Sequence, residues 1–250
     1  MTLTYIVHSG FALETAQCII VFDYWFDPTH VMDRLLQSAK PIYVLTSHFH
    51  EDHFTRSIFD WRLRKSNITY LLSKDILKHR RAQREEADAW LAKGASWQDN
   101  IITVHATGST DSGVSWIIKT EGKLIFHAGD LNNWYARFLT DSYSGGIIRS
   151  TEMDTDVDPE KEEKRYLGEL KDIAKITTHF DIAMFPIDGR IGNGYTRGAR
   201  QFIKRFSVKL LVPMHFLASG FQSAARMQDF ADTAKTAFWA IRHEGESITV

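Results

Sequence analysis

The chain is poor in cysteine, in long apolar runs and in blocks of one charge, and each shortage restricts what it can be. Cys18 is the only cysteine among 250 residues, which excludes an intramolecular disulfide and a multi-cysteine zinc site. It lies in an apolar segment, so we expect a buried, inert thiol rather than a reactive one. Residues 1–8 lack a basic start, and polar residues interrupt the apolar ones after them. A signal peptide or membrane span is therefore not indicated, and we expect a cytoplasmic protein.

The charges are balanced, because 30 lysines and arginines face 31 acidic residues, for a net charge of −1. Without a long basic block, nucleic acid and membrane surfaces are not expected partners. We expect a small-molecule substrate as the partner, while the oligomeric state is not indicated. With 44% hydrophobic residues, the chain can bury the core of a single domain spanning 1–250.

The densest group of chemically active side chains is the stretch His48-Phe49-His50-Glu51-Asp52-His53. The apolar run Pro41–Leu45 before it predicts a buried strand. After it, Phe54, Ile58 and Trp61 recur with the period of a helix face. Imidazoles and carboxylates converging on a turn between strand and helix favour a zinc site, with manganese or iron as alternatives.

This stretch resembles the H-x-H-x-D-H signature of the metallo-β-lactamase superfamily, with His48, His50, Asp52 and His53 at its four positions. Further landmarks follow the family order: apolar segments that run into Asp23, into Gly129-Asp130 and into His215. The resemblance spans nearly the whole chain and implies an α/β (α+β) fold, the four-layer αββα sandwich. The residue pattern alone predicts only a mixed α and β domain.

The resemblance also implies a site with two ions and a metal-bound hydroxide. In it His48 and His50 hold one ion, a second set holds the other, and Asp130 bridges them. The second set is Asp52, His53 and His215. An anionic bridge is physically reasonable, since two cations about 3.5–4 Å apart repel each other. Asp52 is also the expected catalytic residue, which orients the hydroxide or passes on its proton. Asp23 is expected to support the histidine loop or a ligand imidazole from behind.

One family landmark is missing, the third histidine of the first ion, which normally comes from a loop reading H-T-x-G. The loop here is Thr107–Gly113, so Thr110 or Asp111 stands where that histidine is expected. We predict Asp111 as a metal ligand or water-binding group, with the nearby His105 as a weaker alternative. The change affects the number and identity of the ions more than the fold.

His8, in the run His8-Ser9-Gly10, resembles an element of the subgroup that includes L-ascorbate-6-phosphate lactonase. It is expected either at the mouth of the site or as a structural turn residue. Arg190 follows a buried strand, where it can either bind an anionic substrate or be part of an ordinary turn. Five further histidines have no partner at ligand spacing and are expected to have no role in the site: His30, His79, His127, His179 and His243. For His127, which lies three residues before Asp130, a minor supporting role is the alternative.

The local patterns predict further elements. Strands are expected at 3–7, 11–25, 68–72, 101–105, 114–120, 123–127, 181–187 and 209–214, and helices at 80–93, 159–175, 197–206 and 223–240. Residues 132–158 lose periodicity and read as a long loop, of the kind that often carries function.

The predicted function is a metal-dependent hydrolase acting on a small polar ester, lactone or phosphoester. We do not expect the helical substrate domain of a glyoxalase II type thioesterase or the large inserted domain of a β-CASP nuclease, which disfavours these two activities. A flavodiiron reductase has Glu where His50 stands, which disfavours redox chemistry. A metal-dependent binding or sensor protein of the same fold is the alternative.

Overall fold

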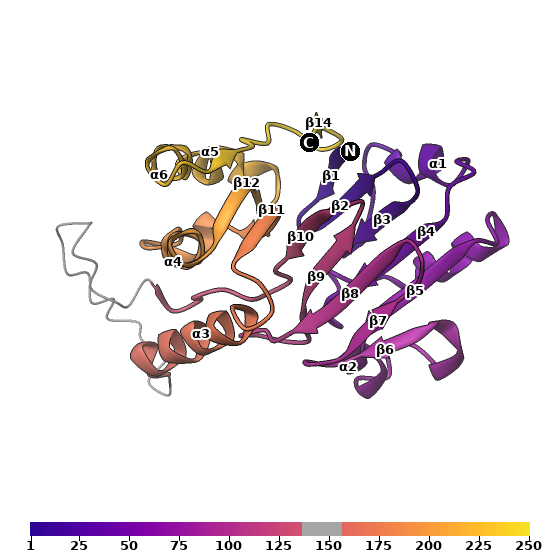
Figure 1. Cartoon of the computed structure of the whole chain (residues 1–250), viewed down its shortest axis with the longest axis horizontal. Helices are drawn as coiled ribbons and strands as arrows, with labels where there is room; N and C mark the ends of the chain where they lie inside the picture. Colours follow the sequence, from indigo (N-terminus) through magenta and orange to yellow (C-terminus); the bar gives the residue numbers. More distant parts are fainter. Residues whose placement is uncertain (137–156) are drawn as a thin grey trace.

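Two sheets form the centre of the protein in its computed structural model, which describes residues 1–136 and 157–250 (Figure 1). The first sheet has the order β14-β1-β2-β3-β4-β5-β6. Its strands are β1 (Thr2–Val7), β2 (Gly10–Glu14), β3 (Ile19–Phe22), β4 (Ile42–Thr46), β5 (Ile68–Ser73), β6 (Ala89–Leu91) and β14 (Ser247–Thr249).

The second sheet has the order β13-β12-β11-β10-β9-β8-β7. Its strands are β7 (Ser96–Gln98), β8 (Ile102–Thr107), β9 (Ser115–Thr120), β10 (Lys123–His127), β11 (His179–Pro186), β12 (Ser207–Met214) and β13 (Ala237–Phe238). In each sheet one half is parallel, β3 to β6 in the first and β10 to β13 in the second. The carboxyl ends of these strands carry most of the site described below.

The core has two parts because side chains alternate between the two faces of a strand. In β3, Ile20 and Phe22 belong to the cluster between the sheets, while Ile19 and Val21 belong to the outer cluster. Three short helices cover that outer face: α1 (Val31–Leu35), the 3₁₀ helix η1 (Arg56–Leu63) and α2 (Lys74–Lys78).

The outer face of the second sheet lies under α3 (Pro159–Ile173) and α4 (Arg197–Arg205). Phe202 of α4 stacks on Phe126 of β10 with ring centroids 5.0 Å apart, and Tyr166 of α3 is buried in the larger core cluster, which extends from between the sheets to this outer face. The helix–sheet–sheet–helix architecture is therefore confirmed. The remaining helices are η2 (Arg84–Glu86), η4 (Gly189–Ile191), η5 (Ala218–Gly220), α5 (Phe221–Ala225) and α6 (Gln228–Thr233).

The predicted helix at 80–93 is wrong. That segment contains η2 and then β6, which pairs in parallel with Leu71–Ser73 of β5. Composition favours a helix there, but the open edge of the first sheet offers backbone hydrogen bonds, and tertiary pairing overrides local propensity.

Three other boundaries differ from expectation. The helix predicted at 223–240 is divided into α5 and α6, and it ends before Lys235, whose φ of 58° is left-handed; the chain then joins the sheet as β13. The strand predicted at 11–25 is two strands, separated by a turn in which the Thr15 hydroxyl accepts from the N–H of Cys18. The helix expected after the histidine cluster is the 3₁₀ helix η1.

Most of the predicted loop, residues 137–156, lies outside the described residues. Among the helices that the structure describes, none has the length and apolar character needed to cross a membrane. Cys18 is a buried free thiol, as expected, and burial raises its pKa.

Candidate metal centre

Acidic and imidazole side chains gather just beyond the carboxyl ends of parallel strands from both sheets. Asp23 follows β3, the histidine stretch 48–53 follows β4, Asp130 follows β10, Asp188 follows β11 and His215 follows β12. Parallel strands bring these ends to one edge of each sheet, where ligands commonly bind in such folds. The site therefore lies where the two sheets meet at that edge.

Asp130 lies between three imidazoles. Its Oδ2 is 3.2 Å from Nε2 of His48, and its Oδ1 is 3.2 Å from Nε2 of His53 and 3.4 Å from Nε2 of His215. Asp130 is only 4% exposed, and His48 and His53 are fully buried. One carboxylate therefore presents its two oxygens to two different sets of imidazoles.

Several of these facing atoms are buried without a hydrogen bond in the described part of the chain. They are Nε2 of His48, Nε2 of His53 and Oδ1 of Asp130. Leaving such atoms unpaired costs about 1–3 kcal/mol each. A cation between them would use their lone pairs together, so the donor set fits a metal ion.

The first set of candidate ligands consists of His48, His50, Asp111 and Asp130, whose ligand atoms all lie within 4.8 Å of one another. Asp111 Oδ2 is 3.5 Å from Nδ1 of His50, and both side chains are partly exposed. Asp111 thus occupies the place beside His50 in which we expected a substitute for the missing histidine.

The two alternatives to Asp111 point elsewhere. The Thr110 hydroxyl donates to the carbonyl of Asn132 at 2.6 Å, which secures the backbone after Asp130. His105 pairs through Nδ1 with the Ser96 hydroxyl at 2.7 Å and belongs to none of the candidate ligand sets among the described residues.

The second set consists of His8, Asp52, His53 and His215, again with ligand atoms within 4.8 Å of one another. His8 Nε2 lies 3.6 Å from Asp52 Oδ2, and the rings of His8 and His215 have centroids 4.4 Å apart. His8 is 1% exposed, so it lies inside the site and not in a surface turn.

Each imidazole facing Asp130 through Nε2 is held through Nδ1 by a polar group behind it. His53 Nδ1 is 2.7 Å from Asp23, His215 Nδ1 is 3.0 Å from Asp188, and His48 Nδ1 is 2.9 Å from the Ser47 hydroxyl. Such partners fix the ring and its tautomer so that Nε2 offers its lone pair forward.

Sequence reasoning missed Asp188, although it noticed the neighbouring Arg190. The usable signal was position, since Asp188 follows a buried strand as Asp23 and Asp130 do. Arg190 pairs with Asp188 through Nε and Nη2, and its Nη2 also donates to the carbonyl of His215 at 3.2 Å.

His127 has a supporting contact instead of a place in the ligand sets. Its Nε2 donates to the Ser9 carbonyl at 2.9 Å, and its Nδ1 accepts the N–H of Gly129 at 3.2 Å. It thereby connects the turn beside His8 with the loop that carries Asp130.

Two glycines let neighbouring loops approach the histidine stretch. A Cβ at Gly113, where φ is +66°, would lie 2.0 Å from the Ser47 carbonyl oxygen, and one at Gly129, where φ is +51°, would lie 2.7 Å from Ser47 Cβ. Any side chain at these positions would push away the backbone that positions His48.

The site also contains backbone strain. His8, Asp23 and His215 have φ values of 57°, 39° and 70°, in the left-handed region that side chains other than glycine rarely adopt. Strain of this kind costs about 1–3 kcal/mol per residue and collects at functional sites.

Charge coupling determines the ionisation of the ion-free protein. Burial acts to lower the pKa of His48 and His215, but Asp130 together with further acids, Asp23 near His48 and Asp188 beside His215, outweighs burial and raises the two pKa values to about 9 and about 10. Burial acts to raise the pKa of Asp130, but the three surrounding histidines lower it, and the pKa falls well below its usual value. Burial lowers the pKa of His8 to about 2.

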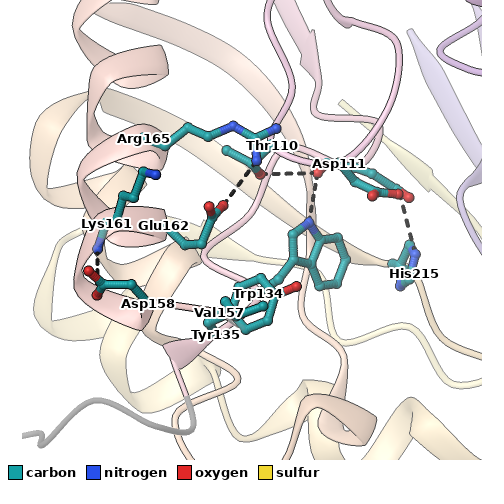
Figure 2. Close-up of a pocket in the computed structure, with 11 residues that line it drawn as sticks. Thr110, Asp111, Trp134, Tyr135, Val157, Asp158, Lys161, Glu162, Arg165 and His215 are labelled. Carbon is teal, nitrogen blue, oxygen red and sulfur yellow. Dashed lines mark hydrogen bonds and ion pairs between the residues drawn. The ribbon is translucent and has the colours of Figure 1, made fainter. Parts of the chain in front are cut away.

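A cavity of about 560 Å³ opens beside this centre (Figure 2). Its wall includes Asp111, Asp130 and His215 at one end and residues of α3 at the other. Trp134 forms part of the wall, and its Nε1 donates to the Asp130 carbonyl at 2.9 Å. Sequence reasoning did not single out Trp134, because it begins the irregular stretch where no periodicity marks a role.

No protein-family model matches the chain. A UPF0173 metal-dependent hydrolase from Natranaerobius thermophilus is 22% identical over 226 residues, which cover 86% of this chain and 83% of that protein. Igni18, a metallo hydrolase from Ignicoccus hospitalis, superposes with a TM-score of 0.67 at 18% identity, covering 99% of this chain and 97% of Igni18. The metallo-β-lactamase fold protein YhfI from Bacillus subtilis superposes with a TM-score of 0.60 at 13% identity, covering 99% and 98%. This chain has the metallo-β-lactamase fold.

The same fold also carries other chemistry. CmlA, a diiron β-hydroxylase from Streptomyces venezuelae, superposes with a TM-score of 0.59 at 13% identity, covering all of this chain and 54% of CmlA. The fold therefore fixes neither the ion nor the reaction, which have to be argued from the site.

Proposed function

We propose that this protein is a metal-dependent hydrolase of small polar esters, lactones or phosphoesters. The carrying observation is Asp130, whose two carboxylate oxygens face two separate sets of imidazoles with unsatisfied buried atoms between them. The names of the relative and of Igni18, a metal-dependent hydrolase and a metallo hydrolase, support the same activity. Lactones are our first choice, because the His8-Ser9-Gly10 run resembles the lactonase subgroup.

His48, His50 and Asp111 would hold one ion, and Asp52, His53 and His215 the other, with Asp130 shared. A set rich in imidazole favours zinc, while the extra carboxylate in the first group leaves manganese or iron as alternatives. When bound, such ions supply a water of lowered pKa and polarise a substrate oxygen.

The chain's own residues then have separate tasks. Asp23 and Asp188 hold the imidazoles of His53 and His215 with Nε2 forward. Asp52, whose side chain is 40% exposed, is the candidate proton acceptor at the open side of the site, 3.6 Å from Nε2 of His8. Trp134 and the cavity wall limit access to small substrates.

Metal analysis and hydrolysis assays test the proposal together. His50→Ala and Asp130→Ala should bind less metal than the wild type while keeping their circular dichroism, and both should lose hydrolysis of a 4-nitrophenyl ester, a lactone or a phosphodiester. His243→Ala is the matched control, because His243 is exposed, lies outside the candidate ligand sets and hydrogen-bonds through its ring to the carbonyl of Glu244. A strong chelator should abolish activity and added metal should restore it. Wild-type metal content in both site variants would refute the site.

A metal-dependent sensor is the second candidate. The observation in its favour is Asp111, a 46% exposed carboxylate side chain in place of a third imidazole, which makes for a weaker, more exchangeable ion. Metal-loaded protein that hydrolyses nothing with zinc, manganese, iron or nickel would favour this candidate.

A further inference from the structure

We propose that Lys161 and Arg165 of helix α3 form an anion-binding subsite for the end of the substrate that is remote from the metal centre. The proposed substrates are then molecules that carry a carboxylate or phosphate group at one end and the bond to be cleaved at the other. This inference rests on the proposed function and deepens it.

The subsite and the metal centre share one cavity. Asp111, Asp130 and His215 line one end, and Lys161 and Arg165 line the other. These two cationic residues are four apart, so they lie on the same face of α3. In Figure 2 the Arg165 side chain reaches toward Thr110, and Lys161 lies on the helix near Asp158.

The acidic residues on the same wall are already engaged. Asp158 Oδ1 accepts the N–H groups of Glu160 and Lys161 at 3.0 and 3.2 Å, as the N-cap of α3. Glu162 Oε2 pairs with Arg165 Nη1 at 3.0 Å. Among the residues that the structure describes, the Lys161 ammonium has no ion-pair partner. Within the described residues, the Lys161 ammonium is therefore a cation on this wall that no carboxylate holds in an ion pair.

Arg165 can add to this charge. Its guanidinium has five N–H donors in a planar fork, of which Glu162 engages only Nη1. The remaining donors suit the paired oxygens of a carboxylate or phosphate. Glu162 holds the guanidinium in place, so less side-chain freedom is lost on binding.

Aromatic side chains separate the two ends. Trp134 and Tyr135 line the cavity, and the Trp134 ring centroid is 4.9 Å from that of His215. An apolar or flat segment fits beside them, while the reactive group meets the metal centre and the anion meets α3. A volume of about 560 Å³ exceeds the needs of a simple acetate ester.

Three esters with one leaving group test the subsite on the metal-loaded protein: 4-nitrophenyl succinate with a free carboxylate, its methyl ester, and the analogue ending in a phosphonate. The wild type should prefer the charged esters in kcat/KM by about tenfold or more, mainly through KM, because one charge-assisted contact contributes on that order. Lys161→Ala and Arg165→Ala should each reduce this preference by about tenfold. The ratio for carboxylate over phosphonate identifies the preferred anion.

Lys164→Ala is the matched control, since Lys164 is an exposed residue of α3 that does not line the cavity. Equal hydrolysis of charged and neutral esters, or a preference unaltered in both variants, would overturn the subsite and leave the hydrolase intact. If none of the three esters is cleaved, and the lactone and phosphodiester are not cleaved either, the hydrolase proposal fails. The subsite is then tested by itself, by measuring with calorimetry how tightly the charged and the neutral 4-nitroanilide analogues bind. Tighter binding of the charged analogue, lost in Lys161→Ala, supports the subsite. Equal binding of the two analogues refutes it.

Discussion

Asp23 Oδ2 lies 2.7 Å from Nδ1 of His53, and both side chains are fully buried. The same carboxylate accepts from the Ser47 hydroxyl at 2.6 Å and from the Ser47 N–H at 2.7 Å. Since Ser47 is also 2.9 Å from Nδ1 of His48, one aspartate at the end of β3 orients two imidazoles that face Asp130.

Asp23→Asn should therefore weaken metal binding without removing a ligand. The amide offers His53 a mismatched partner, and partners behind ligand imidazoles typically account for about 10–100-fold in metal affinity. Competition titration with a coloured chelator measures the change. Asp60→Asn, at an exposed position of η1, is the control. An Asp23→Asn protein with wild-type affinity would contradict the arrangement.

Asp111 should determine the affinity of one ion selectively. Asp111→Ala should lower the occupancy of the first ion by about tenfold or more at limiting metal, while the second ion stays bound. Asp111→His should shift preference from manganese toward zinc, because it restores an imidazole. Glu51→Ala is a control in the histidine stretch itself, because Glu51 is exposed, pairs with Arg81 and belongs to none of the candidate ligand sets among the described residues. Metal analysis that shows both ions lost equally would refute the assignment.

The fold and most of the candidate site follow from local sequence patterns. His48, His50, Asp52 and His53 are contiguous enough that one turn must bring them together, and Asp130 and His215 follow apolar strands whose ends share an edge. Asp188 also follows an apolar strand, but no motif marks it, and Trp134 lies in a stretch without periodicity. Their roles depend on which strands become neighbours.

Elements at sheet edges were the least predictable. Residues 80–93 have helix-forming composition, yet Ala89–Leu91 completes the first sheet, because the free edge of β5 competes for its backbone. The pairing of His8 with the second ligand set needed the bridge between His8 and Phe216, which brings the turn after β1 beside the segment after β12. The cytoplasmic location and the single domain remain predictions.

Metal binding should release protons. In the ion-free protein the pKa values of His48 and His215 are raised to about 9 and about 10, so both imidazoles carry protons at pH 7. Ions bind only the neutral rings, so affinity should rise with pH until these pKa values are passed. Calorimetry at pH 7 in two buffers with different ionisation enthalpies should show roughly two protons released. Binding enthalpies that are the same in both buffers would contradict the raised pKa values.

Glu163 should stabilise the fold through its charge. It receives Arg197 Nε at 2.7 Å, Gln201 Nε2 at 2.5 Å and Asn133 Nδ2 at 3.0 Å, which joins α3, α4 and the segment after Asp130. Burial acts to raise its pKa, but the donors prevail and lower it.

A lowered carboxyl pKa gives stability that is present above the unfolded value of about 4.3 and disappears as pH falls through the folded value. Glu163→Gln should therefore lower the free energy of unfolding by about 1–3 kcal/mol at pH 7, with a smaller loss at about pH 3.5. Urea unfolding at the two pH values measures this, with Glu160→Gln, an exposed position on the same helix, as the control. A loss of equal size at both pH values would show that packing, and not the charge of Glu163, connects these helices.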